Sequence, residues 1–126
     1  MSKTILITGA TSGFGEAMAH VFAAAGNKLI VTGRKESVLA RLKETLVSKH
    51  NVTVHTLCFD VQNKEAVFEA VNSIPAAFKN IDVLINNAGL ALGRDTFQDA
   101  NLDDWETMID TNVKGLLYVS KAVLPL

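Results

Sequence analysis

The sequence predicts an α/β domain built on a doubly wound parallel sheet. Short apolar segments alternate with amphipathic helical patterns along the chain, and the first apolar segment, residues 4–7, leads into a glycine-spaced turn and then a helical pattern. Successive strands joined by helices need right-handed crossovers, so the sheet is expected to be parallel and covered on both faces. We expect one domain over residues 1–126 with the strand order 3-2-1-4.

Apolar periodicity places each element in order. The expected strands are short, apolar and rich in β-branched residues, and they cover residues 4–7, 29–32, 52–59 and 81–85. The expected helices cover residues 13–25, 34–49, 63–75 and 101–125, with Asn63 and Asn101 as caps of the last two. The side chains expected to face the core from these helices are Met18, Val21, Phe22 and Ala25; Val38, Leu42 and Leu46; Val67, Val71 and Ile74; and Trp105, Met108, Ile109, Val113 and Leu116.

The composition limits the possible functions. The chain has 126 residues, 48% of them apolar, and a formal net charge of -1. Its lysines and arginines form no clustered stripe, so no nucleic-acid partner is predicted, and no apolar run has the length expected of a membrane span or a signal peptide. The single cysteine, Cys58, is expected to be a small buried residue in a reducing compartment, which favours the cytoplasm. No metal is expected, because metal-ligand spacing is lacking among His20, His50 and His55.

The turn after the first strand has the features of a phosphate-binding loop. Its three glycines, Gly9, Gly13 and Gly15, would allow a positive φ, the close approach of a pyrophosphate and tight packing of helix on strand. Unpaired N–H groups of the next helix add donors. The other residues of this loop expected to contribute are Thr8, Thr11, Ser12 and Phe14. The layout predicts a Rossmann-like nucleotide site, and a plain strand–helix connection is the alternative.

The end of the second strand favours NADP over NAD. An NAD site usually carries an acidic residue here to bind the ribose 2′-hydroxyl, but this chain has Arg34 and Lys35, and its first carboxylate is Glu36. An arginine fork can bind a 2′-phosphate through two parallel hydrogen bonds, and a lysine adds a point charge. The alternative is that both cations are solvated residues at the start of a helix.

Asparagines mark two further positions. Asn86 and Asn87 directly follow the fourth strand, where their amides must be satisfied, so we expect them to tie loop backbone to loop backbone; a plain turn is the alternative. Ala88 and Gly89 leave room for a flat group or a ribose. Asn112 interrupts the apolar stripe of the last helix, and its amide is expected to bond to backbone or to a water. A structural and a functional role for Asn112 are both open.

Together these motifs resemble the short-chain dehydrogenase/reductase family. The motifs are T-G-A-T-S-G-F-G at 8–15, Asp60 after the third strand, N-N-A-G at 86–89 and W-E-T-M-I-D-T-N-V-K-G at 105–115. In detail they look most like the NADP-dependent 3-hydroxy acid dehydrogenase group, which includes serine 3-dehydrogenases and malonic semialdehyde reductases. Similar dehydrogenases commonly associate through this last helix, so the resemblance implies a homo-oligomer.

The resemblance also implies roles for individual residues. The three glycines of the first turn would hold the pyrophosphate of NADP, Asp60 and Val61 would meet its adenine, and residues 87–89 would line a ribose. Asn112 would correspond to the family's catalytic asparagine, which positions a water in a proton relay.

The remaining catalytic residues of the family are absent from these 126 positions. The family's chemistry needs a serine on a fifth strand and a Tyr-x-x-x-Lys pair on the next helix. The only tyrosine, Tyr118, has its lysine three residues on, at Lys121, and shares a helix with Asn112, so we reject it as a catalytic pair. Because family members have roughly twice this length, we expect the NADP-binding amino-terminal half of a dehydrogenase acting on a small 3-hydroxy acid or hydroxy amino acid.

Other functions would require different features of the sequence. A parallel sheet that stops at its fourth strand has an unpaired edge, which would suit a non-catalytic cofactor-binding or self-assembling half-domain. A methyltransferase would ordinarily keep an acidic residue after the second strand, and this chain has none there. A P-loop enzyme is excluded, because Glu16 and Ala17 stand where a lysine and a hydroxyl residue are required.

Overall fold

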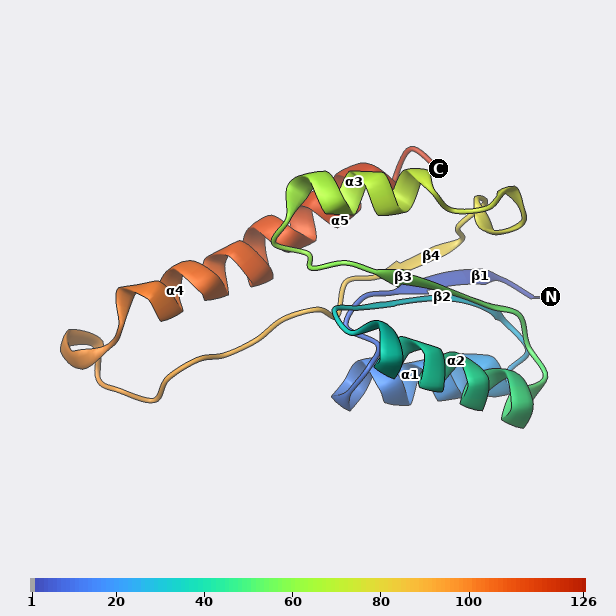
Figure 1. The fold of residues 1–126 in the computed structure, drawn as a ribbon, viewed down its shortest axis with the longest axis horizontal. Coiled ribbons are helices and arrows are strands. Elements are labelled where there is room, and N and C mark those ends of the chain that lie inside the picture. The colour runs from blue at the N-terminus through green and yellow to red at the C-terminus, as the bar shows by residue number, and fades with distance from the viewer. Residues whose placement is uncertain (1) are drawn as a thin grey trace.

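The computed structural model describes residues 2–126 as a four-stranded parallel sheet with helices on both faces (Figure 1). The strands are β1 (Thr4–Ile7), β2 (Lys28–Gly33), β3 (Val54–Cys58) and β4 (Val83–Ile85). The helices are α1 (Gly13–Ala24), α2 (Glu36–His50), α3 (Lys64–Asn72), α4 (Leu102–Ile109) and α5 (Leu116–Val123), with short 3₁₀ turns η1 (Ala76–Phe78) and η2 (Phe97–Asp99) and a π-helix η3 (Asp110–Gly115).

The strand order β3-β2-β1-β4 confirms the predicted 3-2-1-4 topology. The central strand β1 pairs with β2 on one side and with β4 on the other, so that Leu6 lies between Ile30 and Leu84. The chain therefore reverses its winding direction between β1 and β4. In such sheets a ligand binds at the carboxyl ends of the two strands where the order reverses.

Alternation along the strands divides the apolar side chains between two cores. Helices α1 and α2 cover one face of the sheet, and α3 and α5 cover the other (Figure 1). Ile5 and Ile7 belong to the core on the first face, whereas Leu6 belongs to the core on the second. Neighbouring strands repeat the pattern, with Val31 in the first core and Ile30 in the second. The sheet is therefore covered by helices on both faces, as expected for a doubly wound fold.

Two predicted helix faces differ from the observed ones. In α1 the buried residues are Gly15, Ala19 and Ala23. Of the four expected residues, Met18 and Phe22 are partly buried against the first core, whereas Val21 and Ala25 are exposed. Small residues occupy this face because α1 lies close against the sheet at its glycine-rich start. In α2, Leu39 is buried where Val38 was expected, a shift of one position along the helix. The predicted set for the third helix is confirmed, since Val67 and Val71 of α3 are buried and so is Ile74, two residues beyond its end.

The last helix is not the continuous α-helix that its apolar spacing predicts. A π-helix, η3, separates α4 from α5. Its wider turn shifts the buried stripe to Thr111 and Gly115, continued by Val119 and Val123 in α5. The side chains of Ile109, Val113 and Leu116, which were expected to face a core, are exposed. Asn63 and Asn101 cap their helices as predicted, accepting from the N–H groups of Ala66 and Asp103.

Two peripheral features complete the fold. Residues 91–109, here called the arm, extend away from the sheet as a loop, η2 and α4 (Figure 1). Cys58 is exposed at the end of the edge strand β3, which corrects its prediction as a buried residue; its Sγ lies 3.5 Å from the carbonyl oxygen of Arg34. No helix within residues 2–126 combines the length and apolar character needed to cross a membrane.

Candidate functional site

A cavity of about 350 Å³ lies at the carboxyl ends of the strands, where the winding direction reverses. It is formed by the loops after β1, β3 and β4, the end of β2 and one residue of η3. Its lining residues are Gly9, Thr11, Ser12, Gly13, Phe14, Thr32, Gly33, Arg34, Phe59, Asp60, Val61, Gln62, Asn87, Ala88, Gly89, Leu90 and Thr111. The structure thus brings most of the predicted site residues to one place, although they come from five segments of the chain.

Two glycines of the first turn are required by close packing. At Gly9 the backbone φ is +61°, and a Cβ would lie 2.9 Å from the Cα of Ala88. At Gly15 a Cβ would lie 2.1 Å from the carbonyl oxygen of Gly9 and 2.5 Å from Nδ2 of Asn87. Any side chain at either position would push the first turn away from the loop after β4. Gly15 therefore serves the packing of α1, and it does not line the cavity.

The third glycine faces open space. Gly13 has a φ of +56°, and nothing lies within 4 Å of where its Cβ would be. Helix α1 starts at this residue, so its first backbone N–H groups lack intrahelical partners and the positive end of its dipole lies at the cavity. Ser12 precedes the helix without a side-chain capping bond, and the ring of Phe14 is exposed at the cavity edge. This arrangement suits an anionic group such as a phosphate.

Hydrogen bonds join the first turn to the loop after β4. Thr8 is buried, and its Oγ1 accepts from the backbone N–H groups of Asn87 at 3.0 Å and Ala88 at 2.9 Å. In return, Nδ2 of Asn87 donates to the carbonyl oxygen of Gly9 at 3.0 Å. Thr8 thus holds the two loops together and does not itself line the cavity. Of the two amides expected to tie loop to loop, Asn87 does so, whereas Nδ2 of Asn86 donates to Oγ of Ser120 at 3.0 Å.

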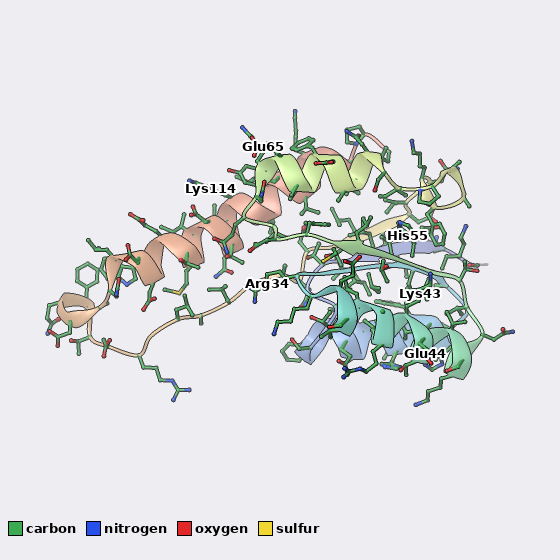
Figure 2. The ribbon with its side chains drawn as sticks, in the orientation of Figure 1. Arg34, Lys43, Glu44, His55, Glu65 and Lys114 are labelled. Atoms are coloured by element: carbon green, nitrogen blue, oxygen red, sulfur yellow. The ribbon has the colours of Figure 1, made fainter. Side chains whose placement is uncertain are left out.

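The two predicted cations take different positions. Arg34 lines the cavity at the carboxyl end of β2, and its side chain, labelled in Figure 2, is exposed. Lys35 is also exposed but is the residue before α2, outside the cavity wall. The carboxylate of Asp60, on the opposite loop, accepts from the backbone N–H of Gln62 at 3.0 Å.

Asn112 is bonded to the loop that borders the cavity. Its Oδ1 accepts from the backbone N–H of Leu90 at 2.9 Å, and its Nδ2 donates to the carbonyl oxygen of the same residue at 2.8 Å. The amide is therefore satisfied by backbone, one of the two expected partners. Because Asn112 lies in the π-helix, its side chain does not interrupt a buried apolar stripe as the sequence had predicted.

Several lining residues were missed by sequence reasoning. They are Thr32, Gly33, Phe59, Gln62, Leu90 and Thr111. Thr32, Gly33 and Phe59 could have been found, since they stand at or just beyond the carboxyl ends of predicted strands, which meet at one edge of a parallel sheet. Thr111 carried no signal except its place beside Asn112.

Other titratable groups lie away from this cavity. Tyr118 packs against the second core, and Lys121 is exposed on the same helix, so neither borders the cavity. His20 on α1 and His50 at the end of α2 lie side by side, with Nδ1 of the first 3.2 Å from Nε2 of the second. Within residues 2–126 no three side chains among His, Cys, Asp and Glu gather as they would around a metal ion.

Comparison with known proteins identifies the family. The model of the short chain dehydrogenase family matches residues 3–126. Sulfoacetaldehyde reductase 2 of Chromohalobacter salexigens is 53% identical over 125 residues, which are 99% of this chain and 49% of that protein. The NADP-dependent 3-hydroxy acid dehydrogenase of Escherichia coli strain K12 is 50% identical over 121 residues, covering 96% of this chain and 47% of its own.

Solved structures agree with the sequence relatives. Serine dehydrogenase from Escherichia coli superposes with a TM-score of 0.87 at 48% identity, covering 97% of this chain and 55% of that one. A closed form of serine dehydrogenase complexed with NADP+ gives a TM-score of 0.87 at 49% identity, over 97% of this chain and 48% of the other. The chain thus spans about half the length of the curated relatives it matches. It belongs to the short chain dehydrogenase family.

Proposed function

We propose that the chain is the cofactor-binding, amino-terminal part of an NADP-dependent oxidoreductase of the short-chain dehydrogenase type. The observation that carries this proposal is the cavity at the carboxyl edge of the sheet, with open space above Gly13 at the start of α1 and a cation, Arg34, at the end of β2. These residues fit a dinucleotide with a 2′-phosphate. The NADP named for one relative and present in a solved neighbour supports the same cofactor.

Each part of the cavity suits one part of NADP. The N–H groups at the start of α1, with Thr11, Ser12 and Phe14 around them, would hold the pyrophosphate. Asp60 and Val61 would meet the adenine, and residues 87–89 would border a ribose. When bound, the nicotinamide supplies or accepts the hydride. Asn112 is assigned the positioning of a water in the proton relay, with its side chain held to Leu90 of the cavity wall by two hydrogen bonds.

The proposed substrate is a small 3-hydroxy acid or hydroxy amino acid. The names of the relatives support this class: a 3-hydroxy acid dehydrogenase, a serine dehydrogenase and a sulfoacetaldehyde reductase. Each of these substrates is a short molecule with an acidic group near the carbon that would exchange hydride. By the same proposal the protein is cytoplasmic, in keeping with its single unpaired cysteine, Cys58.

The choice of cofactor is tested at Arg34. Arg34→Glu replaces a cation by an anion at the proposed 2′-phosphate position, so NADPH affinity should fall about 100-fold through lost charge-assisted bonds. NADH affinity should change little. The measurement is fluorescence titration of the full-length gene product with each reduced cofactor. Lys49→Glu, the same charge change on an exposed residue at the far end of α2, is the control and should leave both affinities unchanged. Equal loss of both cofactors in Arg34→Glu would refute the NADP assignment.

A second candidate function is that of a self-assembling, non-catalytic half-domain. It is favoured by the outer edge of β4, which pairs with no strand among residues 2–126, and by exposed apolar side chains on α5, such as Leu117. Both candidates include association of copies of the chain. Light scattering measures that association, and hydride transfer from NADPH to a 3-oxo acid separates the two: turnover supports the dehydrogenase and refutes the non-catalytic candidate.

A further inference from the structure

The hydroxyl group of Thr111 is buried without a partner. The residue is only 6% exposed, and among the side chains described for residues 2–126 its Oγ1 is the one fully buried oxygen or nitrogen that makes no hydrogen bond. A threonine in a helix usually bonds back to the carbonyl three or four residues earlier. Here it does not. An unpaired buried hydroxyl lowers the stability of the folded chain, so its presence needs an explanation.

The position of Thr111 is fixed by its neighbours in η3. The next residue, Asn112, makes two hydrogen bonds to Leu90. One turn further, Gly115 packs closely against Val61. A Cβ added at Gly115 would lie 2.6 Å from Cγ2 of that valine. The π-helix is therefore attached to the loops after β3 and β4 at once. Thr111 directly precedes the first of these attachments, Asn112, and lines the cavity.

We propose that the Thr111 hydroxyl hydrogen-bonds the adenosine half of the bound cofactor, an inference that rests on the proposed function. The loop holding Asp60 and Val61, against which η3 packs, is the wall assigned to the adenine. Adenosine offers ring nitrogens and ribose hydroxyls, and a threonine hydroxyl can both donate and accept. The ligand thus supplies the partner that the folded chain does not.

The proposal predicts opposite effects on stability and on binding. Thr111→Val keeps the shape of the side chain and removes the hydroxyl. Without ligand, the variant should be at least as stable as the wild type, because it no longer buries an unpaired polar atom. With ligand, it should bind more weakly, because the bond to the adenosine is lost. A purely structural threonine would lose stability on the same substitution.

The experiment uses the full-length gene product and two variants. Isothermal titration with NADP+ and with 2′,5′-ADP, which contains the adenosine half alone, gives the affinities, and thermal unfolding without ligand gives Tm. Thr111→Val should weaken both ligands about three- to tenfold and leave Tm equal or higher. Thr111→Ser, which keeps the hydroxyl, should bind both ligands within about twofold of the wild type by the same reasoning.

Each other outcome overturns the inference in a recognisable way. Unchanged affinity in Thr111→Val means that the hydroxyl does not contact the ligand. A lower Tm of that variant without ligand means that the hydroxyl serves the fold. Weaker NADP+ with unchanged 2′,5′-ADP assigns the contact to the nicotinamide half and refutes the adenosine assignment. A wild-type protein that binds neither ligand refutes the proposed function itself, and the inference falls with it.

Discussion

The sheet and the arm both contain apolar residues but bury them to different extents. Every residue of β1 is buried, with helices packed over both of its faces. The arm, residues 91–109, has no buried residue, and the side chains of Phe97 and Leu102 on it are 80% and 65% exposed. The difference teaches that an apolar stripe stabilises the fold only where the same chain supplies a surface opposite it.

The largest expected effect tests this contrast directly. Leu6→Ala removes a side chain that is 1% exposed in the second core and should lower the free energy of unfolding by about 2–5 kcal/mol. Leu102→Ala, on the arm, should change it by less than about 0.5 kcal/mol. Urea denaturation of both variants, at equal protein concentration, measures the two values. A large loss in Leu102→Ala would show that the arm is covered by another surface in solution.

Substitution of one glycine beside the sheet and one in the arm tests the same difference in packing at the backbone. Gly15→Ala would place a Cβ 2.1 Å from the carbonyl oxygen of Gly9, so α1 must shift, at a cost of about 3 kcal/mol. Gly93, in the arm, has a φ of +75°, and a Cβ there would approach only Oδ2 of Asp104, at 3.4 Å. Gly93→Ala should therefore cost about 1 kcal/mol, from backbone strain alone. Denaturation curves compare the two, and equal losses would contradict the tight packing of the first turn.

Sequence patterns predicted most of the sheet because each strand carries its own signal. The apolar segments at β1 and β2, and the glycine turn after β1, follow from local residue types. The break in the last helix could not be predicted this way. The pattern over residues 101–125 is that of one helix, and η3 has a buried face at Gly115 that packs against Val61, a residue far away in sequence. Contacts between distant segments decided this element, as they decided which residues of α1 face the sheet.

The candidate site was predictable to a similar degree. Gly9, Gly13 and Arg34 were found because glycine spacing and charge at a strand end have direct chemical meaning. Thr111 was not, because an unpaired hydroxyl can be recognised only when all of its neighbours are in place. Lys35 was predicted beside Arg34, yet adjacent residues leaving a strand point in different directions, and only Arg34 lines the cavity. Burial of Cys58 was predicted wrongly because the edge position of β3 is a property of the whole sheet.

The smallest expected effect is on the pH dependence of stability, and it arises in the body of the fold, by which we mean the residues outside the arm. Burial lowers the pKa of His55 on β3 below its usual value of 6.5, and the charge of Lys43 on α2 lowers it further; Figure 2 labels both side chains. The unfolded chain therefore binds a proton at a higher pH than the folded one. Stability from this group is complete above about pH 6.5 and is lost as the pH falls from there toward the lower folded pKa.

Urea denaturation at pH 7.5 and pH 5.5 measures this loss. His55→Gln should show a smaller fall in the free energy of unfolding between the two pH values than the wild type does, because glutamine does not titrate. Lys43→Met should reduce the fall by a smaller amount, since burial is the larger cause of the shift. All three histidines lie outside residues 91–109, so histidine titration acts on the body of the fold and not on the arm. A pH dependence identical in wild type and His55→Gln would show that His55 keeps its ordinary pKa in the folded protein.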